Sequence, residues 1–319
     1  MVVDVADAHR AFRGRSVISA EDFQKEDFLA VLDAARRFDP DGGSHKFEPL
    51  LQGRILATLF HEPSTRTRLS FEAAMLRLGG QVLGFAEPDQ TSFSKGESLA
   101  DAVRVVASYS DVIVMRHPME GAARLASEAS EVPVLNGGDG SNQHPTQTFL
   151  DLYTIREAAG SLDGLKIGFM GDLRYGRTVH SLATALLHFD TELKFIGPEN
   201  LRLPSDLRDQ VERAGRYGGA FTRLEDAGDL DVLYVTRIQK ERFPDALDYE
   251  RVRSAYCVTR PSIERFGEDL KILHPLPRVD EVSTEVDSFP GAVYFEQARN
   301  GVTVRMALLD LILGEGAGA

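Results

Sequence analysis

The sequence predicts an α/β protein of two domains, each a parallel sheet flanked by helices. Short apolar segments of strand length alternate with segments of helical periodicity along almost the whole chain. Strands joined through a helix usually run parallel, so this alternation favours parallel sheets with helices on both faces. The chain has 319 residues, more than one hydrophobic core usually serves, and two domains are therefore expected.

The expected strands are apolar and bounded by polar or Gly-containing segments. They are Ile55–Phe60, Gln81–Phe85, Asp111–Met115, Lys166–Met170, Leu193–Ile196, Asp231–Val235 and Lys271–Leu273. The helical patterns between them include Glu97–Ser108, Pro145–Ala158, Gly176–His188 and Ser205–Arg213. A further helix should follow the first strand and stop at Gly79-Gly80, because apolar positions recur there on one helical face, namely Leu69, Ala73, Leu76 and Gly80.

The boundary between the domains is expected close to Asn142. It follows the Gly-rich stretch Asn136–Gly140, which we interpret as a break in the first series of strands. Pro145 can then open a connecting helix at its first position. Residues 1–142 would form the first domain and residues 143–300 the second.

Composition excludes several classes of protein. Lys and Arg number 36 against 49 Asp and Glu, and the net charge of −13 disfavours nucleic acid or an anionic membrane as the main partner. Cys257 is the only cysteine, which rules out an internal disulfide, offers no metal cluster and fits the cytoplasm best. The first residues lack the apolar core of a signal peptide, and no window approaches the length needed to span a bilayer.

The most informative motif is Ser64-Thr-Arg-Thr-Arg68, which follows the first strand and opens a helix. The first turn of a helix carries unpaired N–H groups and the positive end of the helix dipole, which together favour an anion. Hydroxyl groups and the Arg fork add charge-assisted hydrogen bonds that suit phosphate oxygens. A bare Ser-Thr-Arg would fit an ordinary capped helix equally well, but the doubled motif predicts a phosphate site.

Polar side chains also follow later strands, at the edge where ligands bind in open α/β sheets. The segments are Met115–Pro118, Gly171–Thr178, Thr236–Arg242 and His274–Arg278, and a similar one, Asn142–Thr148, opens the connecting helix. Each alone has an ordinary explanation, such as a surface salt bridge, a structural histidine or a solvated helix start. Gly171–Thr178 resembles a dinucleotide loop in position only, because it lacks the G-x-G-x-x-G pattern and a ribose-binding acid.

Together these segments are rich in Arg, His and Gln and offer no obvious nucleophile, metal cage or cofactor lysine. Such a set suits a reaction that brings two anionic substrates together and stabilises charge on oxygen. The residues alone therefore indicate group transfer from a phosphate-bearing donor to an acidic acceptor.

The same segments closely resemble the catalytic chains of the aspartate carbamoyltransferase family over nearly the whole sequence. The matching motifs are Ser64-Thr-Arg-Thr-Arg68, Met115-Arg-His-Pro118, Gly121-Ala-Ala-Arg124, Asp139–Thr148, Gly171–Ser181, Thr236–Arg242 and His274–Glu281. The resemblance implies the carbamoyltransferase fold and the conversion of carbamoyl phosphate and L-aspartate to N-carbamoyl-L-aspartate and phosphate, in pyrimidine biosynthesis. It implies no metal or organic cofactor. The first domain would bind carbamoyl phosphate and be completed by the C-terminal helix, residues 301–319, and the second would bind aspartate.

The resemblance also implies the roles of individual residues. The phosphate would be bound by Ser64, Thr65, Arg66, Thr67 and Arg116. The carbamoyl oxygen would accept hydrogen bonds from His144, Thr67 and Arg116, and Gln147 would bind the carbamoyl amine. The aspartate carboxylates would be bound by Arg177, Arg237 and Gln239, and the carbonyls of Leu276 and Pro277 would orient the amino groups. The catalytic set would be Arg66, Thr67, Arg116 and His144.

In that family the loop Ser92–Lys95 reaches into the site of a neighbouring subunit, which implies a homotrimer with shared sites. Glu62 would pair with Arg177 and Arg242 when the domains close, a familiar gating motion. His61 departs from the family pattern, because an aromatic residue usually stands there. The resemblance leaves open whether a regulatory chain or a dihydroorotase associates.

Two rival interpretations share these motifs. An ornithine carbamoyltransferase would have cysteine in a late His-Cys-Leu-Pro motif and Ser-Met-Gly in its amine-binding loop. This chain has His274-Pro-Leu-Pro277 instead, and Arg237 would repel a cationic ornithine side chain. An inactive homologue that serves as a scaffold should have lost residues of the phosphate turn or His144, and all of them are present.

Overall fold

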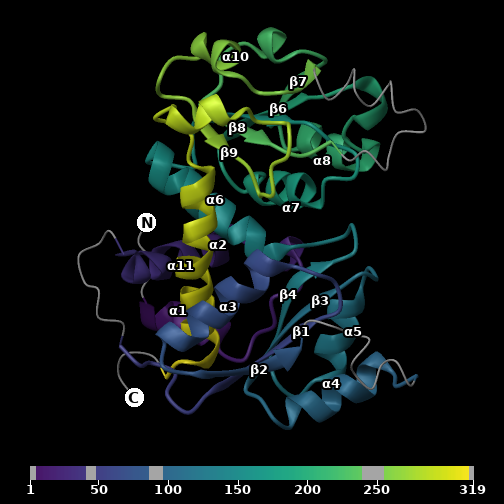
Figure 1. The fold of residues 1–319 in the computed structure, drawn as a ribbon, viewed down its shortest axis with the longest axis vertical. Coiled ribbons are helices and arrows are strands. Elements are labelled where there is room, and N and C mark those ends of the chain that lie inside the picture. Colours follow the sequence, from purple (N-terminus) through teal and green to yellow (C-terminus); the bar gives the residue numbers. More distant parts are fainter. Residues whose placement is uncertain (1–4, 41–47, 86–95, 239–254, 316–319) are drawn as a thin grey trace. The chain divides into compact units, whose positions relative to one another are not determined.

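The computed structural model of the chain describes residues 5–40, 48–85, 96–238 and 255–315 (Figure 1). The chain divides into two compact units. Unit 1 consists of Met1–Tyr153 together with Arg299–Ala319, and unit 2 consists of Thr154–Ala298. Each unit contains a parallel β-sheet flanked by helices, which confirms the predicted fold class.

In unit 1 the strand order is β2-β1-β3-β4, and neighbouring strands are parallel. The strands are β1 Ile55–Phe60, β2 Gln81–Phe85, β3 Val112–His117 and β4 Val134–Asp139. The α-helices are α1 Val5–Phe12, α2 Lys25–Ala35, α3 Thr65–Arg77, α4 Leu99–Ala107, α5 Ala122–Ala129, and parts of α6 Pro145–Ala159 and α11 Tyr294–Leu313. Two short 3-10 helices are η1 Ala20–Asp22 and η2 Arg36–Phe38.

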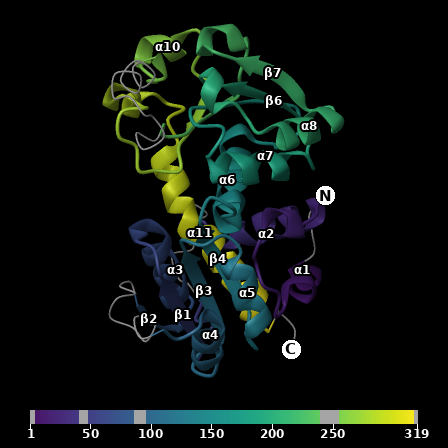
Figure 2. The ribbon, with the colours of Figure 1, turned by 90° about the vertical axis from the view of Figure 1, so that its right-hand side faces the viewer.

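Alternate strand residues of unit 1 face opposite sides of the sheet. Leu59 of β1 and Met115 of β3 belong to an apolar cluster that also contains Val103 of α4 and Ala123 of α5. From the opposite face of β1, the Thr58 hydroxyl donates to Glu72 of α3 at 3.3 Å. Figure 2 shows α3 and α5 on different sides of these strands. Helices on both faces leave the strand ends as the place where a ligand meets the sheet.

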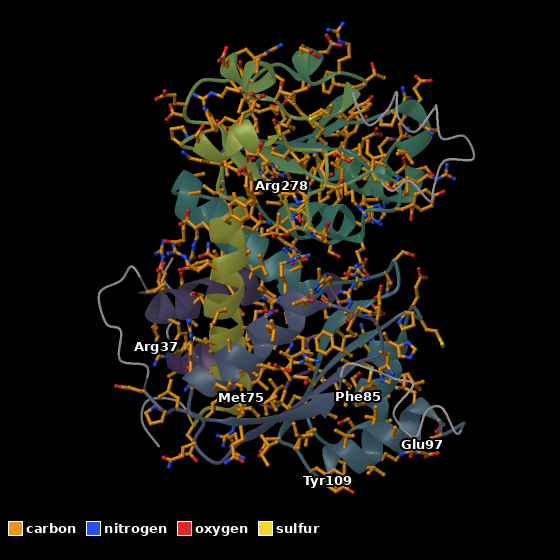
Figure 3. All side chains as sticks on the ribbon, in the orientation of Figure 1. Arg37, Met75, Phe85, Glu97, Tyr109 and Arg278 are labelled. Carbon is orange, nitrogen blue, oxygen red and sulfur yellow. The ribbon has the colours of Figure 1, made fainter. Side chains whose placement is uncertain are left out.

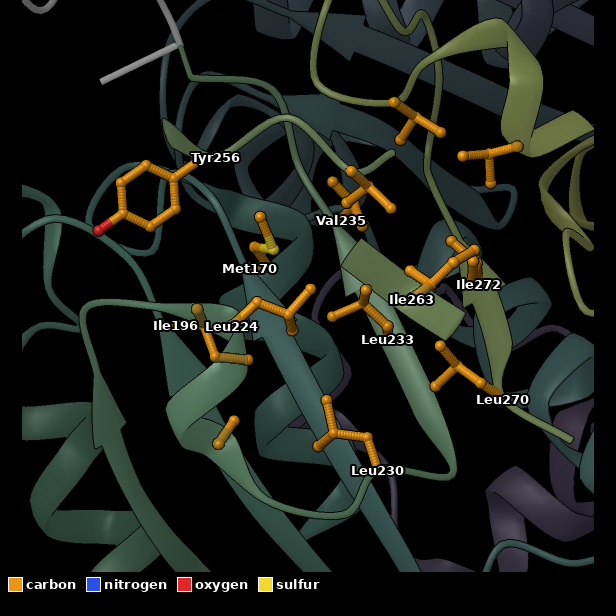
Figure 4. Close-up of a cluster of buried hydrophobic side chains, with 14 of the residues drawn as sticks. Met170, Ile196, Leu224, Leu230, Leu233, Val235, Tyr256, Ile263, Leu270 and Ile272 are labelled. Atoms are coloured by element: carbon orange, nitrogen blue, oxygen red, sulfur yellow. The ribbon is translucent and has the colours of Figure 1, made fainter. Parts of the chain in front are cut away.

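In unit 2 the strand order is β7-β6-β5-β8-β9, and neighbouring strands are again parallel. The strands are β5 Leu165–Met170, β6 Thr191–Ile196, β7 Tyr217–Phe221, β8 Val232–Val235 and β9 Lys271–Leu273. The helices are α7 Arg177–Leu186, α8 Ser205–Arg213, α10 Arg260–Glu264, η6 Glu199–Leu201, η7 Leu224–Ala227 and η9 Thr284–Ser288. An apolar cluster joins Met170, Leu233 and Ile272 of adjacent strands to Ile263 of α10 (Figure 4).

Most expected elements agree with the structure. β1, β2, β9 and α8 have the predicted bounds, and the other predicted strands and helices agree within two residues at either end. The sequence patterns do not predict β4 and β7. The interpretation of Asn136–Gly140 as a break is wrong, because β4 is a buried strand that includes most of this stretch. A side chain at Gly137 would lie 3.2 Å from the carbonyl oxygen of Met115, so the glycine lets β4 pack closely on β3.

The apolar face predicted for α3 is not its buried face. Leu69 and Leu76 are 52% and 61% exposed, whereas Phe71 and Met75 are fully buried. Figure 3 marks Met75 among the side chains of unit 1. The sequence pattern identifies the helical period, but it does not decide which of two apolar faces meets the core. Leu69 and Leu76, seven residues apart on α3, therefore lie at the surface of this single chain.

The described ranges contain neither a membrane-spanning helix nor a metal-binding cluster. None of the helices there combines the length and apolar character needed to cross a bilayer. Nor do three or more His, Cys, Asp or Glu side chains in these ranges gather in a group that could hold a metal ion.

Candidate active site

The carboxyl ends of β1, β3 and β4 share one edge of the unit 1 sheet, because the strands are parallel. The chain passes from β1 to β2 on one side and later reaches β3 on the other. β1 and β3 therefore flank a topological switch point, the usual place for a ligand in an open α/β sheet. The segments of Ser64, Arg116 and His144 follow or end these strands, so the structure brings them to one edge.

Ser64 is the N-cap residue of α3, and its side chain makes no capping hydrogen bond. The N–H groups of the first turn are thus not taken by the cap, which leaves them suited to an anion. Thr65 and Arg66 are exposed at this turn, whereas Thr67 is buried. A side chain at Gly137 of β4 would lie 3.5 Å from the Thr67 methyl group, so Thr67 packs at the end of the sheet.

Carboxylates hold two other arginines of this edge. The Nε atom of Arg116 lies 3.2 Å from Glu62 Oε2, and its Nη1 donates to the Gly137 carbonyl at 3.1 Å. The Nε atom of Arg68 lies 3.1 Å from Glu72 Oε1, one helical turn along α3. Arg116 is thereby fixed at the end of β3, while Arg68 supports the helix rather than the turn.

A hydrogen-bond network around Asp139 positions His144 after β4. The Asp139 carboxylate accepts from the Asn136 amide at 2.8 Å and from the Gln143 backbone N–H at 3.1 Å. These bonds fold the loop back against the strand that precedes it. His144 is buried, with its Nδ1 3.4 Å from the Thr146 hydroxyl. Gln147 follows in the first turn of α6, and its backbone N–H donates to the His144 carbonyl at 2.9 Å.

His61 and His117 form a ring pair beside this edge. Their ring centroids are 4.8 Å apart, and His61 also contacts the edge of Phe85 at 5.1 Å. Burial, reinforced by the charge of His117, lowers the pKa of His61 to about 4. Burial also lowers the pKa of His117, although Asp139 and Glu62 oppose that shift. His61 is therefore neutral at neutral pH and packs as an aromatic ring.

In unit 2 the switch point lies at β5, whose neighbours β6 and β8 are reached in opposite directions. Gly171 follows β5 with a φ of +120°, and a side chain there would lie 2.2 Å from the carbonyl oxygen of Thr236. The ends of β5 and β8 therefore approach so closely that only glycine fits. Arg177 begins α7 and is half-buried, and Arg237 follows β8 and is exposed.

A buried pair holds the loop after β9. His274 Nε2 lies 2.8 Å from Glu281 Oε1, and His274 Nδ1 accepts from the Leu276 N–H at 2.8 Å. Because Nδ1 accepts from an amide, the ring proton is on Nε2 and is donated to Glu281. Burial works to raise the pKa of Glu281, but His274 and backbone N–H donors lower it overall. Leu276 has a φ of +55°, a costly conformation for a side chain, and it precedes Pro277 in the braced loop.

Some of the predicted site residues lie outside the described residues, namely Ser92, Lys95, Gln239 and Arg242. The structure describes the remaining ones in two groups, one at the edge of each sheet. Sequence reasoning missed Asp151, which accepts a hydrogen bond from Gln147 at 2.8 Å. The signal was available, because residues four positions apart on a helix are neighbours.

Models of one protein family match both halves of the chain. A model of the aspartate/ornithine carbamoyltransferase carbamoyl-P binding domain matches residues 15–157. A model of the Asp/Orn binding domain of the same enzymes matches residues 163–312. The chain therefore belongs to the aspartate/ornithine carbamoyltransferase family.

Within this family the chain is most informatively compared with aspartate carbamoyltransferase catalytic subunits. It is 57% identical over 304 residues to that of Thermococcus onnurineus, which covers 95% of this chain and 98% of the relative. It is 56% identical over 311 residues to that of Methanopyrus kandleri, which covers 96% and 99%. These relatives confirm the resemblance inferred from the motifs.

Solved structures agree with the sequence relatives. The catalytic subunit of M. jannaschii aspartate transcarbamoylase has a TM-score of 0.88 and 52% identity, over 93% of this chain and 97% of that one. Aspartate transcarbamoylase from Trypanosoma cruzi, in complex with carbamoyl phosphate and aspartate, has a TM-score of 0.87 and 39% identity, over 95% and 97%.

Proposed function

We propose that the chain transfers the carbamoyl group of carbamoyl phosphate to the α-amine of L-aspartate, giving N-carbamoyl-L-aspartate and phosphate in pyrimidine biosynthesis. The observation that carries this proposal is an anion-binding helix start at Ser64 that shares a sheet edge with Arg116 and His144. The relatives support it, because they are aspartate carbamoyltransferase catalytic subunits. The T. cruzi neighbour holds the same two substrates.

The donor substrate would bind at the unit 1 edge, which makes unit 1 the carbamoyl-phosphate domain in this proposal. The uncapped turn of α3 offers N–H groups to the phosphate, with Ser64, Thr65, Arg66 and Thr67 adding side-chain donors. Arg116 bridges the phosphate and the carbamoyl oxygen. His144 and Thr67 complete the set of donors to that oxygen, and Gln147 binds the carbamoyl amine.

In the reaction the deprotonated α-amine of aspartate attacks the carbamoyl carbon. A C–N bond forms while the bond from carbon to the phosphate oxygen breaks, and its electron pair leaves on phosphate. The proton lost by the attacking amine goes to the departing phosphate. Negative charge on the carbonyl oxygen during this step is stabilised by His144, Thr67 and Arg116, and one such donor is typically worth about 3–4 kcal/mol.

The acceptor would bind at the unit 2 edge, which makes unit 2 the aspartate domain. Arg177, Arg237 and Gln239 bind the two carboxylates, and the carbonyls of Leu276 and Pro277 accept from the amines. The arginines favour a dicarboxylate over ornithine, whose side chain is cationic. The braced loop of Leu276 supports this role, because His274 and Glu281 hold its backbone in a costly conformation.

The assembly in this proposal is a homotrimer in which Ser92 and Lys95 serve a neighbouring site. The exposed leucines of α3 support it, since Leu69 and Leu76 follow the phosphate turn on the same helix. A contact there would place a second subunit beside the turn. We expect the protein in the cytoplasm, because a chain with a single cysteine has no internal disulfide of the kind found in secreted proteins.

The first experiment measures carbamoyl-amino-acid formation by the purified chain with carbamoyl phosphate, comparing aspartate with ornithine. We expect product with aspartate alone. Product with ornithine alone would favour the rival carbamoyltransferase, and no product with either, under conditions where the chain is folded, would favour an inactive scaffold.

A second experiment tests the shared site. The variants Lys95→Ala and Arg66→Ala should each be inactive, and mixing them after mild dissociation should restore part of the activity. The restored activity comes from hybrid trimers that contain an intact site. Mixtures that remain as inactive as the separate variants, although size analysis shows that subunits exchange, would contradict the shared site.

A further inference from the structure

The nitrogen and the oxygen of the Gln147 side-chain amide have different surroundings within unit 1. Its Nε2 donates to the Oδ1 atom of Asp151 at 2.8 Å, one turn further along α6. Asp151 is 0% exposed, whereas Gln147 is only partly buried. Among the residues that the structure describes, none donates a hydrogen bond to Gln147 Oε1. The amide nitrogen therefore points to the protein and the amide oxygen is left for another partner.

Arg305 of α11 is a buried cation whose charge interacts with that of Asp151. Its side chain is buried, 3% exposed, with the guanidinium 4.8 Å from the centre of the Phe71 ring. Burial lowers the pKa of Arg305 to about 10, and the charge of Asp151 opposes that shift. Arg305 thus remains a cation at neutral pH. An ionised carboxylate accepts hydrogen bonds and donates none, which suits Asp151 to the N–H group of Gln147.

This polarity decides what Gln147 can recognise. An amide side chain has a donor end and an acceptor end, and by itself it can present either one. With Nε2 turned towards Asp151, Oε1 is the end of the amide that points away from that carboxylate and towards a ligand. An oxygen acceptor matches the NH2 group of a carbamoyl group, and it offers nothing to a methyl group of the same size.

We propose that Asp151 fixes Gln147 with its oxygen outward and so selects a carbamoyl donor over an acyl phosphate of similar shape. This inference rests on the proposed function and deepens it. Asp151 is a positioning residue, because it acts on the substrate through Gln147. The expected contribution to selectivity is about 10- to 100-fold, the range for a hydrogen bond whose partner would otherwise be left unmatched.

The test measures how strongly acetyl phosphate competes with carbamoyl phosphate while aspartate is turned over. Its readout is the ratio of the acetyl phosphate inhibition constant to the carbamoyl phosphate KM, which a general loss of stability does not move. In Asp151→Asn the new amide can donate as well as accept, so Gln147 is free to turn. We expect the ratio to fall about 10-fold or more.

A double variant provides the rescue. In Gln147→Glu with Asp151→Asn, the carboxylate at position 147 accepts from the new asparagine and still presents an oxygen outward. The net charge near Arg305 is unchanged, which protects the fold if Asp151→Asn alone does not fold. We expect the double variant to keep a ratio close to that of the parent chain. A folded double variant that has lost the preference would overturn the proposal.

Asp310→Asn is the matched control, because Asp310 is another buried carboxylate of unit 1. It lies 3.5 Å from His9 and 3.3 Å from Arg37, and it should lower stability without changing the ratio. A folded Asp151→Asn variant with the parent ratio would overturn the inference alone. An inactive parent chain would instead overturn the proposed function. The ratio of binding constants would then come from thermal shifts with each acyl phosphate, and equal constants would overturn the inference too.

Discussion

The two sheet edges hold their polar groups in different ways. At the edge of unit 1, side chains that would meet carbamoyl phosphate are buried or braced: Thr67 and His144 are buried, and Arg116 is held by Glu62 and a carbonyl. At the edge of unit 2, the braced part is backbone, in the loop of Leu276, while Arg237 is exposed.

This difference follows from what each edge would have to do. Groups that stabilise charge developing during the reaction are effective only if they are already in place. Groups that bind a carboxylate equally well before and during the reaction contribute to substrate affinity and not to the rate of the chemical step. Substitutions at the unit 1 edge should therefore lower kcat, and those among the unit 2 arginines should raise the KM for aspartate.

Replacing His144 should have the largest effect. In His144→Ala one donor to the carbonyl oxygen is lost, and we expect kcat to fall about 10²- to 10³-fold with little change in the KM for aspartate. Steady-state kinetics with both substrates varied would measure this. His188→Ala, after α7 in unit 2, is the control and should leave kcat close to that of the parent chain. If His144→Ala raised the KM for aspartate and left kcat unchanged, the expected difference between the two sheet edges would be contradicted.

Breaking the buried pair of unit 2 should cost stability first. In His274→Ala the buried Oε1 atom of Glu281 loses its donor, and we expect about 3 kcal/mol less free energy of unfolding, measured by urea denaturation. The double variant His274→Leu with Glu281→Leu should recover most of that stability. It should nevertheless bind aspartate weakly, because the Leu276 N–H has lost its acceptor. Normal aspartate affinity in the double variant would show that the loop needs no bracing.

Removing an exposed arginine of unit 2 should have a smaller effect, confined to aspartate. In Arg237→Ala a charged hydrogen bond worth about 1.5–3 kcal/mol is lost, so we expect the KM for aspartate to rise about 10- to 100-fold. The KM for carbamoyl phosphate should not change. Arg223→Ala removes an exposed arginine 3.4 Å from Glu225 in the same unit and serves as the control. An unchanged aspartate KM would contradict the carboxylate assignment.

The smallest expected effect is on the pH dependence of stability. Because the pKa of His61 is about 4 in the folded chain and about 6.5 in an unfolded one, the unfolded state binds more protons between these values. Stability is therefore lost as the pH falls from 6.5 towards 4. At pH 5 we expect a loss of about 1 kcal/mol after allowance for the partly exposed ring. Thermal melts of the parent and of His61→Phe at pH 7 and 5 should show a smaller loss in the variant.

Local sequence patterns were enough to predict much of the fold and the phosphate-binding turn at the edge of the unit 1 sheet. The strand Ile55–Phe60 and the helix start at Ser64 are adjacent in sequence, so one short segment carries both the apolar run and the anion-binding turn. The sequence patterns did not predict β4 and β7, and the physical reason is the same for both strands. Both contain consecutive glycines, which have no side chain to signal burial, and their strand conformation depends on pairing with distant neighbours.

Two features near the edge of the unit 1 sheet depend on contacts between residues that are far apart in the sequence. The buried face of α3 is decided by the sheet and α11 that pack on it, and the sequence shows only that two apolar faces exist. The orientation of Gln147 depends on Asp151 on the next turn, and the charge of Asp151 interacts with that of Arg305 near the end of the chain. The roles that the family resemblance implies for single residues remain predictions.

The exposed leucines of α3 have a consequence for how the protein should respond to dilution. Leu69 and Leu76 lie on the helix whose first turn would hold the phosphate. If other copies of the chain cover them, covering is a binding equilibrium governed by protein concentration. Specific activity should then decline below a threshold concentration and recover on concentrating, and saturating substrate should move that threshold downwards. Mass action would thus make the turnover of each site depend on how many other chains are present.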